Sequence, residues 1–307
     1  MAAYLISSSK IRLTTIRKCK TKIRLRFHLK INETKFLTIP LIHEPILECP
    51  WFYAIKCDFV GYFATTMHRK DMKQLFISDN KILPKAYISR MDKPSLKVPV
   101  ALQDARVMSN QSRKHHLAVC LQPIFLLADW TLLVQFFEIW IAQGVTKFCV
   151  YVQSMTPEVD ALLHVYEHSK DVEIERINWA PLPADDSATY ENDDPNLRIY
   201  RTEVATSIND CLLRSRGYAK YVISSDLDEI VVNYKESSLL NLLDNLQTKF
   251  KKSAAFIIRS SFALFEGILT FHPSRSFFAE AAGQFPIEHN LIFHPGDVPN
   301  PTQLCLQ

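Results

Sequence analysis

Hydrophobic residues follow two different spacings along the chain, and the change falls near residue 113. Before it, short apolar runs are separated by prolines, and apolar and polar residues alternate over 11–31, which predicts strands with one exposed face. The polar segment 104–116 is typical of a linker. We therefore predict a smaller, mainly-β N-terminal region over residues 1–112 and a second domain over residues 113–307.

Beyond residue 113, strands and helices are predicted to alternate. Strands are expected at 117–125, 147–153, 172–177, 221–223 and 254–259, and helices at 130–143, 157–167, 197–216 and 237–250. Asp129 is placed to cap the first helix and Gly144 to end it. Alternation of this kind requires crossover connections, so we predict an α/β domain with a parallel-rich sheet and helices on both faces. The pattern becomes unclear after about residue 265.

The glycines exclude two common nucleotide-binding loops. Only six are present, at 61, 144, 217, 267, 283 and 296, and this spacing allows neither GxGxxG nor GxxxxGK. The longest stretch without Asp, Glu, Lys or Arg is residues 115–128, whereas a membrane-spanning helix needs about 20 apolar residues. We therefore expect no membrane anchor in this sequence.

Positive charge is concentrated at the start of the chain. Residues 1–35 hold ten Lys or Arg against one acid, Glu33. The alternating pattern favours an ordinary strand, while a basic flank beside a membrane anchor and an organelle presequence are alternatives. A third alternative is a nucleic-acid-binding arm, which would bind RNA or DNA in a strongly salt-dependent way. If the basic segment is an ordinary strand, which the alternation favours, no nucleic acid partner is expected.

Cysteine and asparagine patterns bear on the compartment. The seven cysteines form no CxxC pair, so a structural zinc site is not predicted. Asn32 and Asn110 each begin an N-glycosylation motif, which favours a secretory lumen. In such a compartment Cys49 and Cys57, which flank a short segment, are a candidate local disulfide.

Two aspartates follow a predicted strand. Asp226 and Asp228 come after the apolar run 221–223, so both carboxylates are expected at a strand end. Carboxylates at this spacing suit Mn²⁺ or Mg²⁺, whose open positions accept phosphate oxygens. A chain without a glycine-rich loop would need such a metal to hold a diphosphate. The alternative interpretation is an acidic turn that caps the strand.

From about residue 116 to 265 the chain resembles glycosyltransferase family 92. The resemblance rests on CLQPIF (120–125), DW (129–130), QG (143–144), KF and VYVQS (147–154), DALLHVYE (160–167), NWAPLP (178–183), NDCLLR (209–214) and YVISSDLDEI (221–230). It implies a GT-A type fold, a UDP-sugar donor such as UDP-galactose, Mn²⁺ dependence, and inverting transfer to a glycan acceptor, an N-glycan being one candidate. Asp226 and Asp228 match the family's metal-binding DxD motif. Family members are typically anchored in the Golgi membrane with a luminal catalytic domain.

An inverting transfer also needs a carboxylate that takes the acceptor's proton. The acids available after the DxD motif are Glu266, Glu280 and Glu288, which the sequence does not rank, and for each of them an ordinary surface acid is the default interpretation. For the donor we predict contacts from Gln122, at the end of the first strand, and Arg201, at the start of the helix that follows an acidic loop.

Two function classes remain open from the sequence. The first is a metal-dependent galactosyltransferase-like enzyme. The second is a non-catalytic glycosyltransferase-like binding domain that retains the donor site and lacks a complete acceptor site. The residues after 265 distinguish the two, because that part of a GT-A enzyme forms the acceptor side.

Overall fold

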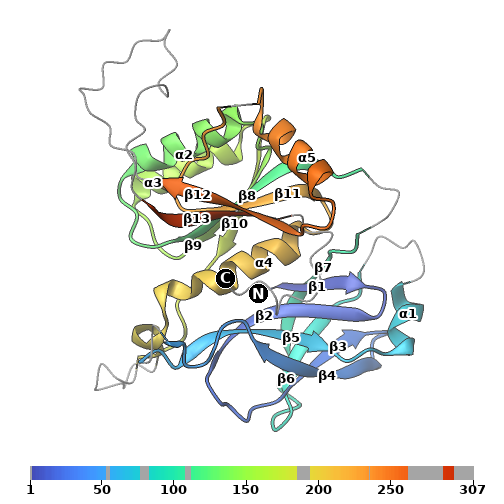
Figure 1. Cartoon of the computed structure of the whole chain (residues 1–307). Helices are drawn as coiled ribbons and strands as arrows, with labels where there is room; N and C mark the ends of the chain where they lie inside the picture. Colours follow the sequence, from blue (N-terminus) through green and yellow to red (C-terminus); the bar gives the residue numbers. More distant parts are fainter. Residues whose placement is uncertain are drawn as a thin grey trace.

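A computed structural model describes residues 2–52, 56–76, 83–107, 112–184, 194–234, 236–261 and 286–293. The described chain forms a closed β-barrel followed by a six-stranded sheet with helices on both faces. Figure 1 shows the barrel below and the sheet above, with one helix between them. The mixed α/β class predicted from the sequence is confirmed.

The barrel contains the first seven strands. These are β1 (Ala2–Ser7), β2 (Lys10–Lys18), β3 (Leu25–Lys30), β4 (Phe36–Pro45), β5 (Phe59–Thr66), β6 (Ala86–Arg90) and β7 (Val98–Asp104). Their order is β1-β2-β5-β4-β3-β6-β7, and a parallel pair between β1 and β7 closes the ring. The short helix α1 (Lys70–Phe76) adds Met72 and Phe76 to the same apolar core.

The basic start of the chain is part of this barrel rather than an extended arm. Residues 2–30 form β1, β2 and β3, and the apolar residues of the alternating pattern that lie within β2 and β3 pack in the barrel core, whereas Ile23 and Ile31 are exposed. Leu13, Phe27 and Leu29 are fully buried there, but two polar members of the pattern, Arg12 (5% exposed) and His28 (3% exposed), are buried as well. The strands are confirmed, whereas the exposed polar face expected for them is wrong at Arg12 and His28, because Arg12 is hydrogen-bonded to Thr65 and His28 to Thr38 and Ser89.

The second sheet follows from β8 onward. Its strands are β8 (His115–Ile124), β9 (Lys147–Val152), β10 (Glu173–Asn178), β11 (Ala219–Ser225), β12 (Ala255–Ser261) and β13 (Pro286–Phe293), in the order β10-β9-β8-β11-β13-β12. The four strands from β10 to β11 are parallel, and β13 runs antiparallel to both of its neighbours. The sequence pattern did not predict this antiparallel strand.

Helices cover both faces of the sheet (Figure 1). The helices are α2 (Trp130–Ala142), α3 (Pro157–Glu167), α4 (Val204–Ser215) and α5 (Leu239–Lys249). Side chains of α2, α3 and α5 share one apolar cluster with the sheet, and α4 shares another on the opposite face. The carboxylate of Asp129 accepts a hydrogen bond from Thr131 N at 2.9 Å, and Gly144 has a φ of 90°, so both predicted ends of α2 are confirmed.

The helix predicted over 197–216 is shorter than expected. Residues 195–198 and 201–203 form 3₁₀ turns, and α4 begins only at Val204. Arg201 and Glu203 both have positive φ, at 43° and 61°, and a regular right-handed helix cannot continue through such residues. Helix α4 therefore begins only after Glu203. The interruption coincides with docking on the barrel, because the Glu203 carboxylate accepts a hydrogen bond from Gly61 N at 2.9 Å.

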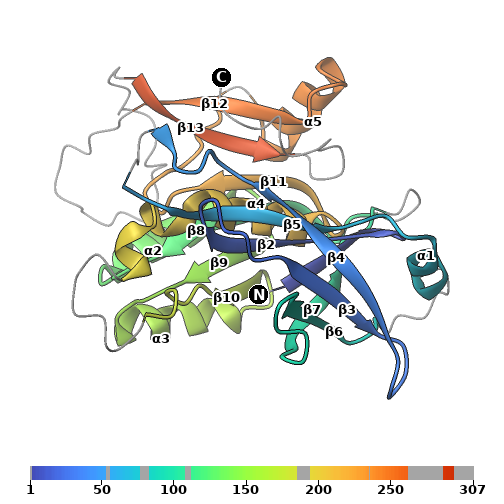
Figure 2. The same ribbon diagram turned by 90° about the horizontal axis from the view of Figure 1, so that it is seen from below.

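Helix α4 joins the two parts of the molecule and lies between them (Figure 1), and in the view from below it lies behind strands of the barrel (Figure 2). Asp210, in the middle of α4, is 4% exposed. Its carboxylate accepts hydrogen bonds from Tyr4 (2.8 Å) and Thr14 (3.0 Å) of the barrel, from Tyr151 (2.8 Å) of β9, and from Arg214 (3.1 Å). Four donors match the acceptor capacity of a carboxylate. The barrel is therefore fastened to one face of the sheet through a satisfied buried charge.

Two disulfides are formed within the described part of the chain, and neither is the pair suggested by the sequence. Cys49 is bonded to Cys19, with 5.4 Å between their Cα atoms, and the Cys57 thiol is free. The chain after β4 returns to the end of β2, so a partner 30 residues away in sequence lies closer than the local candidate. A second disulfide, Cys120–Cys211, ties α4 to β8. Among the described residues, no helix is long and apolar enough to cross a membrane.

Candidate active site

Gln122 and Asp226 lie at the carboxyl ends of two neighbouring strands, Gln122 two residues before the end of β8 and Asp226 directly after β11. At this point the order of the strands in the sheet reverses. After β8 the chain continues to β9 and β10 on one side, whereas β11 pairs with the other side of β8. Open α/β sheets bind ligands at such a reversal, outside the carboxyl ends of the strands. In the parallel register Ser225 lies opposite Leu121, so Gln122 and Asp226 are the next residue on each strand.

The predicted metal ligands lie in a tight turn at this point. Asp226 is partly buried and Asp228 is exposed. The turn is closed by a hydrogen bond from Glu229 N to Asp226 O at 3.3 Å, and the carboxylate of Glu229 accepts one from Asp226 N at 3.2 Å. The buried hydroxyl of Ser225 lies 3.1 Å from both Asp226 O and Glu229 O. Ser225, Asp226 and Glu229 thus share one hydrogen-bonded unit that encloses Leu227 and Asp228.

The far end of the same loop is also fixed to the domain. Val231 is 5% exposed and belongs to the apolar cluster beneath α2. Its carbonyl oxygen accepts a hydrogen bond at 2.6 Å from the side chain of Gln143, which follows α2. The loop that carries the two aspartates is therefore held at both ends by buried residues.

The donor set suits a hard divalent cation shared with a substrate. Asp226 and Asp228, which are separated by one residue in the turn, supply carboxylate oxygens, the type of ligand that Mn²⁺ and Mg²⁺ prefer. Within the described residues, no group of three or more His, Cys, Asp or Glu could hold a metal alone. Magnesium-type sites commonly use one or two carboxylates and complete the coordination shell with water and substrate phosphates. The residues present fit that pattern.

Gln122 lies near the end of β8, where the strand is irregular. The pairing of β8 with β9 shifts between Leu121 and Ile124, and Gln122 is partly buried. Irregularities of this kind redirect side chains and are common beside active sites.

Arg201 lies in the segment that docks on the barrel. Its guanidinium is 5.6 Å from the centre of the Tyr200 ring, and that ring packs edge-on against Trp51, 5.0 Å away. The neighbouring Arg198 is hydrogen-bonded to Asp58 of the barrel at 2.8 Å. Arg198 and Arg201, which precede α4, thus lie beside residues of the barrel and its loops. Gln122 and the two aspartates lie instead at the carboxyl ends of β8 and β11.

Of the three predicted base candidates, Glu266 and Glu280 lie outside the described residues. Glu288 is in β13, of which the backbone alone is described. Leu291 pairs with Ser224 and the strands are antiparallel, so Glu288 comes three residues beyond this pair, toward the carboxyl end of β11. The backbone of Glu288 therefore approaches the edge that carries Asp226.

Sequence reasoning named neither Ser225 nor Glu229 as a site residue. Both flank the DxD motif in the run Ser224-Ser225-Asp226-Leu227-Asp228-Glu229. Serine and acidic side chains next to a predicted turn frequently form hydrogen bonds with its backbone. This tendency was the sequence signal by which Ser225 and Glu229 could have been found.

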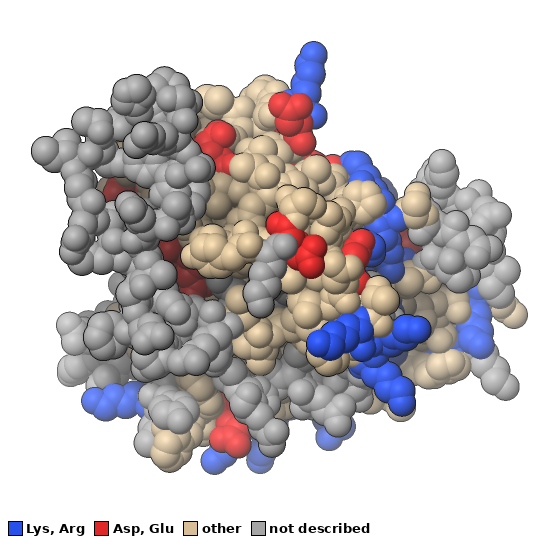
Figure 3. All heavy atoms as spheres, turned by 45° about the horizontal axis from the view of Figure 1, so that its top comes forward, with Lys and Arg blue, Asp and Glu red and all other residues tan. Residues whose placement is uncertain are grey.

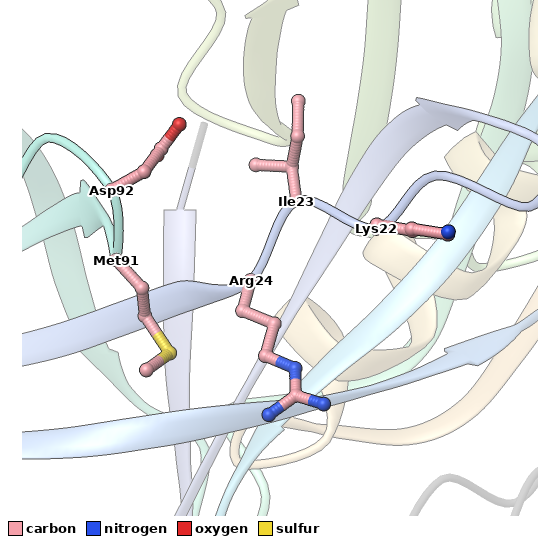
Figure 4. Close-up of a pocket in the computed structure, with 5 residues that line it drawn as sticks. All are labelled: Lys22, Ile23, Arg24, Met91 and Asp92. Atoms are coloured by element: carbon pink, nitrogen blue, oxygen red, sulfur yellow. The ribbon is translucent and has the colours of Figure 1, made fainter.

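A pocket on the barrel shares no lining residue with the candidate active site. It has a volume of about 330 Å³ and is lined by Lys22, Ile23, Arg24, Met91 and Asp92 (Figure 4). None of the predicted site residues lines it. On the face shown in Figure 3, acidic and basic side chains both occur with uncharged surface between them.

Comparison with known proteins decides the family. The model of the family described as Glycosyltransferase family 92 matches residues 115–276. The chain belongs to glycosyltransferase family 92. The match begins with β8 and includes the turn that carries the two aspartates, so the resemblance seen in the sequence is confirmed.

Two curated relatives from Caenorhabditis elegans are similar to this family 92 chain. A glycosyltransferase family 92 protein is 26% identical over 191 residues, which cover 62% of the chain and 32% of that relative. A β-1,4-galactosyltransferase is 24% identical over 167 residues, which cover 53% of the chain and 37% of that relative. The chain thus spans about a third of the length of the curated relatives it matches.

Proposed function

We propose that this family 92 chain is a metal-dependent glycosyltransferase with a GT-A type nucleotide-sugar-binding domain. It transfers galactose from UDP-galactose to a glycan acceptor, with inversion. The observation that carries the proposal is the position of Asp226 and Asp228 beside Gln122, at the reversal point of a parallel sheet. The galactose assignment is supported by the name of the similar nematode β-1,4-galactosyltransferase.

In this proposal Asp226 and Asp228 would hold Mn²⁺ or Mg²⁺ together with the diphosphate of the donor. The bound cation supplies positive charge that stabilises the leaving nucleoside diphosphate. Gln122 and Arg201 are the proposed donor contacts of the protein. Inversion follows from a single displacement, in which the acceptor oxygen bonds to the anomeric carbon as the bond to the diphosphate breaks.

Glu288 is the base that we propose for this displacement. A general base must remove the proton of the acceptor hydroxyl on the face opposite the diphosphate. The register of β13 against β11, which brings the Glu288 backbone toward the carboxyl end of β11, supports this choice, while Glu266 and Glu280 lie outside the described residues.

Calorimetric titration of UDP-galactose into the folded chain, with and without Mn²⁺, tests the donor site. We expect binding that requires Mn²⁺. Absence of binding by the folded protein would refute the proposal. Binding without transfer to any glycan acceptor would instead support a non-catalytic, donor-binding domain.

We further propose that the protein acts in the Golgi or secretory-pathway lumen. Two disulfides suit an oxidising compartment. Asn32 is exposed in the turn between β3 and β4, where its motif is accessible, while Asn110 lies outside the described residues. Secretion from eukaryotic cells should therefore yield a chain whose electrophoretic mobility changes on enzymatic deglycosylation, and an unchanged mobility would weaken the proposal.

A further inference from the structure

We propose that Ser225 and Glu229 are positioning residues that hold Asp226 and Asp228 in the arrangement a divalent cation needs. This inference rests on the proposed metal-dependent function and deepens it. It concerns residues that would act through the aspartates rather than bind the metal themselves.

The hydrogen bonds within the turn support this role. Glu229 contacts Asp226 twice, because its backbone N donates to Asp226 O at 3.3 Å and its carboxylate accepts from Asp226 N at 3.2 Å. A backbone amide and a side chain thus connect the same two residues in opposite directions. Asp228 lies between the bonded residues, so its backbone is confined by the same ring of contacts.

Ser225 links this turn to the buried end of β11. The residue is 1% exposed, and its hydroxyl lies 3.1 Å from the carbonyl oxygens of both Asp226 and Glu229. A serine hydroxyl has a single proton, which can be donated to either oxygen while the turn keeps its shape. The side chain thereby holds the first and last residues of the turn together.

Because the protein offers only two proposed metal ligands, the way Ser225 and Glu229 hold the turn affects metal binding strongly. A cation held by two carboxylates gains affinity from the protein only if both are already oriented for it. Residues that orient metal ligands typically contribute about 10- to 100-fold to metal affinity. The exposed position of Asp228 leaves its orientation dependent on the turn backbone rather than on packing of its own side chain.

Two substitutions at residue 229 separate positioning from direct metal binding. Glu229→Ala removes the acceptor of the Asp226 amide, whereas Glu229→Gln keeps an acceptor oxygen and loses the negative charge. Metal binding is measured with Mn²⁺ as the probe in the presence of UDP, from the loss of the electron paramagnetic resonance signal of free Mn²⁺. We expect Glu229→Ala to weaken Mn²⁺ binding about 10- to 100-fold and Glu229→Gln to bind nearly as wild type.

Ser225→Ala supplies an independent test within the strand. We expect it to weaken Mn²⁺ binding, while Ser224→Ala, which removes the preceding hydroxyl of β11, serves as the matched control and leaves binding unchanged. Circular dichroism and the Tm of each variant confirm that it is folded.

The possible outcomes distinguish the two levels of the proposal. If wild type binds Mn²⁺ and Glu229→Ala binds equally well, the positioning role is wrong and the metal site stands. If Glu229→Gln is as weak as Glu229→Ala, the carboxylate charge acts on the metal directly, and positioning is again refuted. If wild type with UDP binds no Mn²⁺, the metal site fails and the positioning role fails with it.

Discussion

Asp226 and Asp228 lie two residues apart in different surroundings, and this difference sets what each contributes. Asp226 is partly buried and enters the turn through its backbone, whereas Asp228 is exposed. An exposed carboxylate contributes little to folding, since surface substitutions usually change the free energy of unfolding by about 0.5 kcal/mol or less. The role that we propose for Asp228 is therefore metal binding and not stabilisation of the fold.

We therefore predict that Asp228→Asn abolishes Mn²⁺-dependent binding of UDP-galactose and leaves the Tm nearly unchanged. Calorimetric titration and thermal unfolding of the same preparation measure both quantities. Asp171→Asn, at another exposed carboxylate, is the control and should bind as wild type. Unaltered donor affinity in Asp228→Asn would refute the assignment of this residue as a metal ligand.

Glu288 supports a second prediction for a single residue. If it is the base, Glu288→Gln should lower kcat about 10²- to 10⁴-fold while Mn²⁺-dependent donor binding persists, because proton removal is needed only during transfer. A transferase assay and a donor titration are compared for Glu288→Gln, Glu266→Gln and Glu280→Gln. Loss of transfer in either of the other two variants, with Glu288→Gln active, would reassign the base.

Among the elements, local sequence signals account for α2 and α3 and fail for the start of α4. Asp129 and Gly144 act on the backbone within a few residues of themselves, so the ends of α2 could be predicted. The start of α4 depends on contacts with the barrel, including Arg198 with Asp58 and Glu203 with Gly61. Such partners lie about 140 residues apart, and no helical pattern reveals them.

The close approach of α4 to β5 yields a prediction at this scale. A Cβ atom at Gly61 would lie 1.7 Å from Thr206 Oγ1 and 2.9 Å from Glu203 Oε2. We expect Gly61→Ala to lower the free energy of unfolding by about 1–3 kcal/mol, because the helix must move away from the strand. Urea unfolding measures the loss.

A double substitution tests the reason for that loss. Adding Thr206→Ala removes the nearest clashing atom, so the cost of Gly61→Ala should be smaller in that background than in wild type. An equal cost in both backgrounds would show that contact with Thr206 is not responsible.

For the whole molecule, the sequence could predict the class of each half but not how the halves combine. Alternation within residues 11–31 indicated strands, yet closure of the barrel depends on β1 pairing with β7, about 100 residues later. The strand ending at Asp226 was visible as an apolar run, but its place beside Gln122 depends on strand order. The DxD motif and Gln122 were therefore each predictable as site residues, whereas their positions on paired strands were not.

Two buried histidines, His28 and His115, and the partly buried His43 give a prediction about the stability of the whole chain. Burial lowers the pKa of His28 and His115, and burial together with Arg17 lowers the pKa of His43 to about 4. In the unfolded chain these groups titrate near 6.5. Between these pKa values the unfolded state binds more protons than the folded state, so the free energy of unfolding must fall as the pH decreases.

We accordingly expect urea midpoints to decrease as the pH is lowered from about 7 to about 5, the range in which unfolded histidine becomes protonated. This destabilisation should be absent above the pKa of histidine in the unfolded chain. It should increase as the pH falls, until the pH reaches the pKa of each histidine in the folded protein. His43→Gln removes one of these groups, so its midpoint should depend less on pH than that of wild type. A wild-type midpoint that stays constant or rises over this range would contradict the burial of neutral histidine, and an unchanged slope in His43→Gln would exclude His43 as a contributor.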